Sequence, residues 1–521
     1  MAALFALLIL AVMSGVPAVV PVSQAVGPVP TGLLGLAGLL TGLAPPIAFF
    51  ASARRWPGLL LLALWVVGSA ALSVNTAVVA PNPYPLRRPT LDQAAEAWLA
   101  HCAPRGAGLH NGGGQDGRVR VMLVGAAGGA SRAALWSGAV LQTLEQTLPL
   151  DPAHELFAVS GVSGGALGVT GYVVLLNRAH SVCSAAPTGD GEARGAALQK
   201  ALGQDFLSPT LAGLFFSDGW WHVLGPVSAA LQRIGVVSME RTGWLQQSWD
   251  RAFHRALSPT LVEQSFDGMT PRLPLLFTTG THVPSGRLVV TTPVTGREGG
   301  GCVEPAASAV LGAIDALQAL RADPSFAVVA SNSARFAYVT APGLLVDRVT
   351  REERGEVVDG GYYYNLGTTA LQAAADALDR AFARLSAPGG ALAGTRLDVF
   401  IVQVWSDPDR LEVSRCGKTL KLLEVAPYSP TALDFLLSPI GAPAGVRSER
   451  ANAGGVAMMG RYCGVPSRHY AAFTMGPDAS GVKTPLNWVL TSQMRRTIAM
   501  PGLTGFPGMG NEAELTRLAF E

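Results

Sequence analysis

The chain has 521 residues, of which 49% are apolar and only 14% are charged, and its mean hydropathy is +0.32. This composition excludes a disordered chain, which needs low hydrophobicity and high charge. The 38 Lys and Arg residues against 36 Asp and Glu residues give a net charge of +2. That balance argues against a nucleic-acid partner, because nucleic-acid binders usually carry a basic excess. The length suits one large α/β domain with additional segments.

The first 80 residues have the composition of a membrane region. Residues 1–53 contain no charged side chain, and only Arg54 and Arg55 are charged before Arg87. A helix needs about 20 apolar residues to cross a bilayer, and three stretches come close to that length: 2–20, 31–53 and 59–80. We therefore expect about three transmembrane helices in residues 1–80. A buried hairpin of a soluble protein is the alternative. For the first stretch, a cleaved signal peptide is a further alternative, although no basic residue precedes Arg54.

Basic residues next to these stretches give an expected orientation. Arg54 and Arg55 lie between the second and third stretches, and the positive-inside rule places that connection in the cytoplasm. Everything after Pro81 is then extracytoplasmic, although Arg87 and Arg88 favour the opposite orientation. We expect a multi-pass membrane protein whose larger domain, after Pro81, faces away from the cytoplasm.

The sequence of residues 81–117 predicts a linker that contains a short helix and a glycine-rich loop. From residue 119 onward, strand-like apolar runs alternate with helical patterns. The expected strands are 119–124, 156–160, 273–278, 288–292, 326–330 and 397–404. The expected helices are 91–103, 131–148, 164–176, 369–385 and 485–498. This alternation predicts an α/β domain over residues 118–505, with a mainly parallel sheet covered by helices on both faces, and then a C-terminal tail at 506–521. The five cysteines show no CxxC spacing, so neither a zinc ribbon nor a redox pair is indicated.

Residues 161–165, Gly-Val-Ser-Gly-Gly, match the pattern G-x-S-x-G between an expected strand and an expected helix. A tight turn of this kind exposes the serine Oγ, and small neighbours let a substrate approach. The helix dipole also favours negative charge that develops at this position. A plain turn is the alternative in a chain with 61 glycines. The strand–turn–helix context favours Ser163 as a nucleophile.

A second glycine-rich turn joins an expected strand to an expected helix. Its residues are Gly128, Gly129, Ala130, Ser131 and Arg132. Successive backbone N–H groups in such a turn form an anion-binding nest, which suits either a phosphate or an oxyanion. The turn fits neither G-x-G-x-x-G nor the Walker pattern. It therefore favours an oxyanion hole, and a helix N-terminus without a ligand is the alternative.

Asp359 ends an apolar run and is followed by two glycines. This arrangement predicts a carboxylate exposed on a tight turn, which could accept the proton of Ser163 as a general base. Considered alone, an Asp-Gly pair more commonly marks a hairpin turn. The proposed role of Asp359 therefore depends on the other two motifs.

In this order the three motifs resemble the patatin-like phospholipase family, and in particular a bacterial branch with membrane spans before the catalytic domain. The resemblance covers roughly residues 115–500, and the stretches 333–336, 359–365 and 485–490 add to it. It implies a patatin-like three-layer α/β/α sandwich, a bacterial inner-membrane location and a Ser163–Asp359 dyad without histidine. The implied oxyanion donors are Gly128, Gly129, Ala130 and Gly164, and the implied supporting basic residue is Arg132.

The chain departs from the family pattern at one position. The family usually has a third glycine where this chain has Ala130, and a positive φ would strain an alanine there. An α/β-hydrolase triad is the alternative enzyme class, and His469 is the one histidine after Asp359. The other histidines show no metal-ligand spacing, so we expect neither a metal nor another cofactor.

The sequence therefore predicts a membrane-tethered serine acyl hydrolase that acts on membrane lipids or other acyl esters through an acyl-enzyme. A triad esterase and a catalytically silent lipid-binding membrane protein are the alternatives. Residues 211–237 are rich in large apolar side chains, which predicts either packing between helices or a lipid-facing lid.

Overall fold

The computed structural model describes residues 2–52, 77–83, 88–101, 117–148, 155–178, 191–234, 238–256, 273–296, 312–336, 339–406 and 434–520, with shorter stretches between them. A nine-stranded sheet forms its centre, in the order β11-β10-β2-β3-β4-β5-β6, with β9 paired to β4 and β8 paired to β9. The strands of this sheet are β2 (Arg118–Ala126), β3 (Leu156–Val162), β4 (Leu275–His282), β5 (Leu288–Thr291), β6 (Ile314–Asp315), β8 (Gly343–Val346), β9 (Glu353–Asp359), β10 (Arg396–Trp405) and β11 (Arg468–Thr474). The pairs from β11 through β4 are all parallel. The prediction of a mainly parallel sheet is confirmed.

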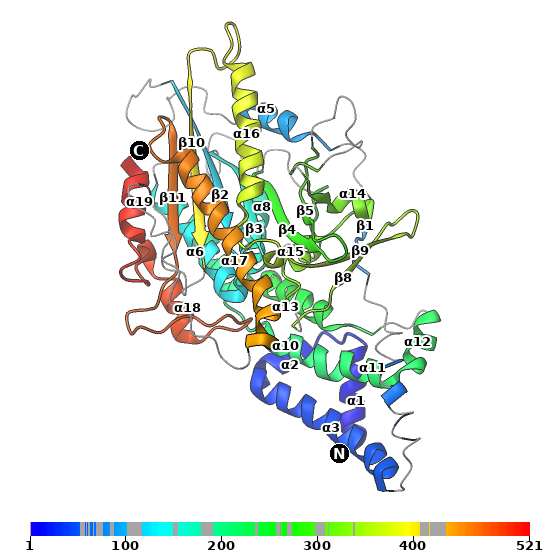
Figure 1. Ribbon diagram of the computed structural model, residues 1–521. Coiled ribbons are helices and arrows are strands. Elements are labelled where there is room, and N and C mark those ends of the chain that lie inside the picture. The colour runs from blue at the N-terminus through cyan, green and yellow to red at the C-terminus, as the bar shows by residue number, and fades with distance from the viewer. Residues whose placement is uncertain are drawn as a thin grey trace.

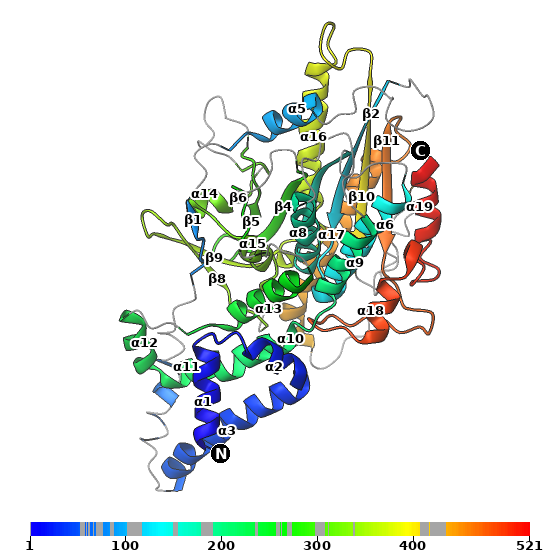
Figure 2. The same ribbon diagram turned by 180° about the vertical axis from the view of Figure 1, so that it is seen from behind.

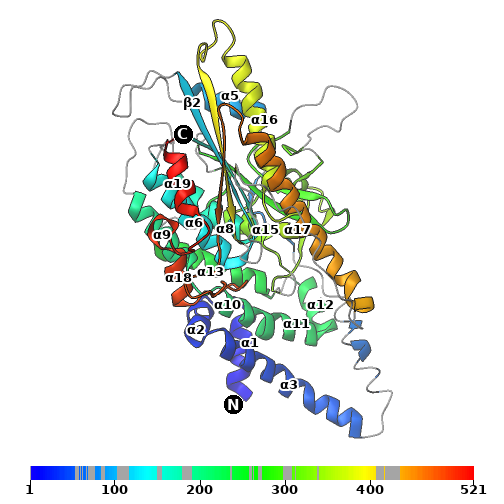
Figure 3. The same ribbon diagram turned by 60° about the vertical axis from the view of Figure 1, so that its left-hand side comes forward.

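Helices cover both faces of this sheet (Figure 3). Along β2, Met122 and Val124 belong to one apolar core, whereas Val121 and Leu123 belong to the other. This alternation is the period of two that a strand buried on both faces requires. The first face carries α6 (Ala130–Thr147), α8 (Gly164–Arg178), α9 (Gly191–Leu202), α13 (Arg241–Ala256) and α15 (Phe326–Ser333), seen in front in Figure 2. The second face carries α5 (Leu91–His101), α16 (Thr368–Leu385) and α17 (Asp434–Tyr462).

Three expected elements differ from the structure. Residues 326–330, predicted as a strand, form the buried helix α15, because a short apolar run looks the same for a buried strand and a buried helix. Residues 485–491 are not helical, and the helix α18 is confined to Ser492–Ile498, capped by the Thr491 side chain. The expected C-terminal tail contains α19 (Asn511–Phe520), whose Leu515 and Leu518 join the core.

The N-terminal region forms three helices, α1 (Ala2–Met13), α2 (Val19–Val26) and α3 (Pro28–Ser52). The first expected membrane span is therefore not one helix, because the chain turns at residues 14–18, where Gly15 has a φ of +72° and Pro17 follows. Among the described residues, one helix segment, Pro28–Phe49, is long and apolar enough to cross a membrane, a test that a signal sequence near the N-terminus also passes. The third expected span, 59–80, lies largely outside the described residues.

A helical segment rich in aromatic residues packs on these N-terminal helices (Figure 1). It runs through α10 (Leu207–Ala212), the π-helical turn η1 (Gly213–Asp218) and α11 (Gly219–Leu224), followed by α12 (Pro226–Arg233). Phe216 is buried together with Val12, Val20 and Trp244. The prediction of packing between helices is therefore confirmed for this part of the segment 211–237.

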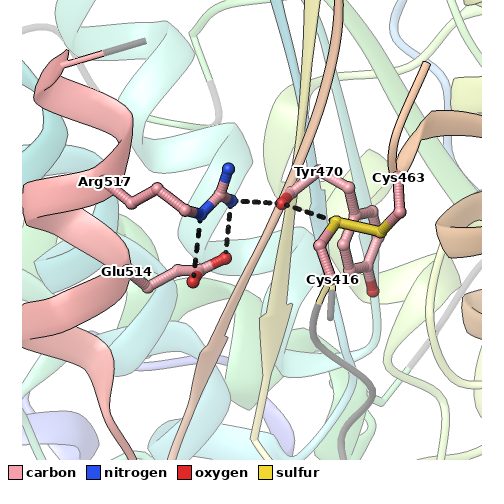
Figure 4. Close-up of a disulfide and its surroundings, with 5 residues drawn as sticks. All are labelled: Cys416, Cys463, Tyr470, Glu514 and Arg517. Carbon is pink, nitrogen blue, oxygen red and sulfur yellow. Dashed lines mark hydrogen bonds and ion pairs between the residues drawn. A yellow bond between two sulfur atoms is a disulfide. The ribbon is translucent and has the colours of Figure 1, made fainter. Parts of the chain in front are cut away.

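A disulfide joins Cys416 to Cys463 at the end of α17 (Figure 4). The Cys416 sulfur lies 3.7 Å from the carbonyl oxygen of Tyr470 in the edge strand β11, and Arg517 of α19 donates to the same carbonyl. The disulfide thus lies where α17, β11 and α19 come together. The other three cysteines lie outside the described residues.

Candidate active site

Ser163 occupies a sharp turn between β3 and α8. Its φ is +53°, which places a non-glycine residue in the left-handed region. Such a conformation is costly and tends to occur at functional sites. The turn also requires a glycine at the next position, because a Cβ on Gly164 would lie 1.9 Å from the carbonyl oxygen of Ala130. The Gly-x-Ser-Gly pattern thus brings the serine turn against the glycine-rich turn before α6.

Asp359 faces Ser163 from the end of β9. The Ser163 hydroxyl donates to Oδ2 of Asp359 at 2.6 Å. The other carboxylate oxygen, Oδ1, accepts the Gly361 amide at 2.7 Å. Thr281 of β4 donates from Oγ1 to the Asp359 carbonyl at 2.9 Å. These bonds hold the carboxylate in place, so it can orient the hydroxyl and receive its proton.

The backbone of Ser163 is held by Ser333, a residue that the sequence analysis did not assign a role. The Ser163 amide donates to Ser333 Oγ at 2.9 Å, and that hydroxyl donates to the Thr279 carbonyl at 2.6 Å. Ser333 thereby occupies the backbone N–H of Ser163. Its position in the stretch 333–336, which contributed to the family resemblance, was the one available signal.

Gly128 is fixed by contacts within the protein. Its amide donates to the Asn365 carbonyl at 3.2 Å, and its own carbonyl accepts Ser406 Oγ at 2.6 Å and Asn365 Nδ2 at 3.3 Å. Among the expected oxyanion donors, the Gly128 amide is therefore already used. Ser406 is a second residue to which the sequence analysis assigned no role, and Asn365 had entered it only as the end of the stretch 359–365.

The remaining expected donors are the amides of Gly129, Ala130 and Gly164. Gly129 is the residue before α6, and Gly164 is the first residue of α8. The first N–H groups of a helix have no intrahelical partner, so they are suited to bind negative charge. Ala130 has a φ of +51°. The expected strain at this position is therefore present in the structure.

Arg132 is buried within the first turn of α6. Its Nη1 donates to the Thr484 carbonyl at 2.7 Å, and only 7% of the residue is exposed. This bond links the glycine-rich turn to the segment after β11. Arg132 also lines the cavity described next.

A cavity opens over Ser163 and Asp359. It encloses about 770 Å³ of empty space, including the part open to solvent. Its polar wall contains Ser163, Asp359, Asn365, Arg132 and the glycine-rich turn. Its apolar lining residues are Leu207, Phe336, Val339, Leu486 and Trp488. The arrangement suits a ligand with one polar reacting group and an apolar remainder.

His469 lies far from this cavity. It stacks on Phe400, with ring centroids 4.3 Å apart. In the sheet, His469 of β11 is the register partner of Phe400 in β10. The same row continues through Met122 of β2 to Leu156 of β3. Leu156 begins β3, seven residues before Ser163. At about 3.3 Å per residue and 4.8 Å per strand, His469 is about 23 Å along and 14 Å across the sheet from the serine. The structure does not bring His469 into the site.

His282 is the histidine on β4, next to the Asp359 strand. Its Nδ1 bonds with Ser285 Oγ at 2.7 Å and its Nε2 with the Arg354 carbonyl at 2.8 Å, so neither nitrogen is directed at Ser163. In the part of the chain that the structure describes, no group of three or more His, Cys, Asp or Glu residues could hold a metal ion.

Fold and site together define an α/β protein with a serine on a strand-to-helix turn and a carboxylate within hydrogen-bonding distance. No family model matches the chain, and no curated protein matches it either. Among solved structures, human GIVD cytosolic phospholipase A2 is similar at 12% identity, over 60% of this chain and 46% of that one, with a TM-score of 0.32. The complex of that enzyme with methyl gamma-linolenyl fluorophosphonate is 13% identical, over 82% of this chain and 60% of that one, with a TM-score of 0.33. VipD from Legionella pneumophila gives 11% identity over 77% and 66%, with a TM-score of 0.28. The chain thus spans about half to two thirds of these structures.

Proposed function

We propose that this protein is a membrane-tethered serine acyl hydrolase that cleaves lipid esters with a Ser163–Asp359 dyad. The observation that supports the proposal most directly is the 2.6 Å hydrogen bond from the Ser163 hydroxyl to the Asp359 carboxylate. A nucleophile and base within hydrogen-bonding distance are the geometric signature of covalent catalysis. The left-handed backbone of Ser163 is a second support.

The reaction follows from this geometry in two steps. As Ser163 Oγ attacks the ester carbonyl, its proton passes to Asp359 Oδ2, and the amides of Gly129, Ala130 and Gly164 stabilise the oxyanion. The C–O bond to the alcohol then breaks, and Asp359 returns the proton to the leaving alkoxide. Water, deprotonated by Asp359, attacks the acyl-enzyme, and the fatty acid is released while the proton returns to Ser163.

The residues that line the cavity and the N-terminal helices support the proposed substrate class. Five apolar side chains line the cavity that holds the reacting serine, which suits an acyl chain rather than a charged peptide. The uncharged helix α3 would hold the enzyme at a bilayer, where acyl esters are abundant. Neither feature requires a cofactor.

Ester turnover by full-length protein in detergent tests the proposal. Wild-type enzyme should hydrolyse 4-nitrophenyl octanoate, and Ser163→Ala should lose about 10⁴-fold or more in turnover. Ser386→Ala is the matched control, because Ser386 follows the far end of α16 and should change nothing. Acid quenching during turnover should trap an octanoyl group, found by peptide mass spectrometry on Ser163. Trapping on another residue, or full activity of Ser163→Ala, would exclude the assignment.

A further inference from the structure

We infer that the helices α1–α3 position the mouth of the cavity at a lipid bilayer, so that a bilayer lipid enters the site directly. This inference rests on the proposed function and adds the physical source of the substrate. It is supported by three observations: the exposed face of α3, the contacts on its inner face, and a hydrogen-bonded connection from α2 to the cavity wall.

The outer face of α3 is apolar, exposed and uncharged. Only 6% of the most apolar 18-residue window of its membrane-length segment is buried. Its exposed side chains include Leu33, Leu34, Leu36, Leu40, Ile47 and Phe49. The helix has 25 residues, which at 1.5 Å per residue is about 37 Å, slightly more than the roughly 30 Å hydrocarbon core of a bilayer.

The inner face of α3 is shaped to hold the segment that begins at the cavity. A Cβ on Gly35 would lie 2.3 Å from Phe215 Cβ, and a Cβ on Gly42 would lie 2.3 Å from Trp220 Cη2. The missing side chains of these two glycines therefore leave the space that the aromatic residues occupy. Because residue numbers rise together on both helices, α3 and the segment from α10 to α11 run side by side in the same direction.

Two hydrogen bonds connect α2 to the cavity wall. Gln24 Nε2 donates to the Asp205 carbonyl at 2.7 Å, and the Phe206 amide donates to the Trp488 carbonyl at 3.0 Å. The Asp205 carboxylate also accepts the amide of Leu207, the first residue of α10, at 2.9 Å. Leu207 and Trp488 both line the cavity. The apolar wall of the cavity is thus fixed to the N-terminal helices.

The polar contacts of these helices gather at the end nearest the cavity. Besides Gln24, the Arg251 guanidinium of α13 donates to the Pro17 carbonyl at 3.4 Å in the turn between α1 and α2. From that end α3 extends away from the sheet, as Figures 1 and 3 show. With α3 in the hydrocarbon and these polar groups at its boundary, the cavity mouth lies at the membrane interface.

A bilayer fits this face better than a protein partner does. Protein interfaces surround an apolar centre with a polar rim, whereas residues 1–53 contain no charged side chain. Hydrocarbon requires no such rim, and a helix satisfies its own backbone hydrogen bonds there. The lack of charge over the whole helix length is what assigns the face to lipid.

Vesicle flotation and two substrates test the inference on full-length protein. Wild-type protein, diluted from detergent, should float with phosphatidylcholine/phosphatidylglycerol vesicles. Leu33→Lys with Leu40→Lys changes two exposed leucines seven residues apart. This double variant should lose at least tenfold in vesicle binding and in hydrolysis of vesicle phospholipid, yet keep its activity on soluble 4-nitrophenyl butyrate within twofold. Val349→Lys with Val465→Lys, also at exposed valines, is the matched control and should behave as wild type.

Several outcomes would overturn the inference and leave the proposed ester hydrolysis by Ser163 and Asp359 standing. If wild-type protein stays soluble and fails to float, the inference is overturned whatever the variants show. A double variant that floats and cleaves vesicle lipid normally would also overturn it, and a changed particle mass in that variant would assign the face to a second copy of the chain. Ser163→Ala should float like wild type without turnover, which separates membrane docking from catalysis.

Discussion

Replacing Asp359 by asparagine should remove catalysis while keeping the shape of the site. An asparagine can still accept the Gly361 amide through its oxygen, but it cannot take the proton that Ser163 Oγ now donates across 2.6 Å. Because the two residues act as one unit, the loss should approach that of Ser163→Ala, about 10⁴-fold or more in turnover. At 1.36 kcal/mol per tenfold, this is about 5.5 kcal/mol or more of transition-state stabilisation.

His469→Ala provides the contrasting measurement. The strand register puts His469 at the row of Leu156, at the opposite end of β3 from the serine. An imidazole about 23 Å along the sheet cannot exchange a proton with Ser163 directly. We expect less than a twofold change in turnover. The substitution removes a stacked ring from Phe400, so a modest loss of stability is compatible with full activity.

The assay is the initial rate of hydrolysis of a soluble ester by both variants, with circular dichroism to confirm folding. In a triad the order of effects would differ, because the histidine carries the proton and the acid only orients it. A collapse of activity in folded His469→Ala would refute the dyad. Folded Asp359→Asn with more than a few per cent of wild-type turnover would refute the role of Asp359 as base.

Two further predictions concern stability. Ala130 has a φ of +51°, so Ala130→Gly should relieve left-handed strain and raise the free energy of unfolding by about 0.5–1 kcal/mol, net of the added chain entropy, with ester turnover retained; a lower thermal midpoint would contradict this. Burial alone would raise the pKa of Asp347, but the amides of Thr350 and Val349 and the guanidinium of Arg354 lower it to about 2. Its stabilising effect should therefore be complete above about pH 4 and be lost as the pH falls through about 2. The difference in unfolding free energy between wild type and Asp347→Asn should shrink over that interval, and a constant difference would refute the assignment.

Elements buried on both faces were predictable from sequence because their apolar runs are long and bounded by turns. β2, β3 and β10 lie where the pattern put them, and so do the turns that hold Ser163 and Asp359. The structure of the short run that begins at Phe326 was not predictable, because its five apolar residues show no periodicity that separates a helix from a strand. Long-range support was also out of reach. The Ser333 hydroxyl meets Ser163 across 170 residues, and no local pattern encodes a contact of that kind.

The pairing of α3 with the segment from α10 to α11 shows the same limit. Both stretches were recognised as apolar, but each was interpreted separately. The glycines of α3 make room for Phe215 and Trp220, which pack against them. Sequence composition identifies the N-terminal region as apolar and uncharged. The segment on which it packs is set by tertiary contacts between residues about 180 positions apart, which composition does not reveal.

The bond between Cys416 and Cys463 bears on which side of the membrane the sheet lies. Charge counting leaves the topology nearly balanced, because Arg54 and Arg55 oppose Arg87 and Arg88. Thiol chemistry is independent of that balance, since structural disulfides persist in oxidising compartments and are rare where glutathione and thioredoxin keep thiols reduced. Under the proposed membrane tethering, a chain that keeps this bond in the cell would have its sheet across the bilayer from the cytoplasm, and the leaflet within reach of Ser163 would be the outward-facing one. Assembly of α17 against β11 would in that case follow translocation, and it would depend on the cell's machinery for oxidising thiols as well as on the protein's own core.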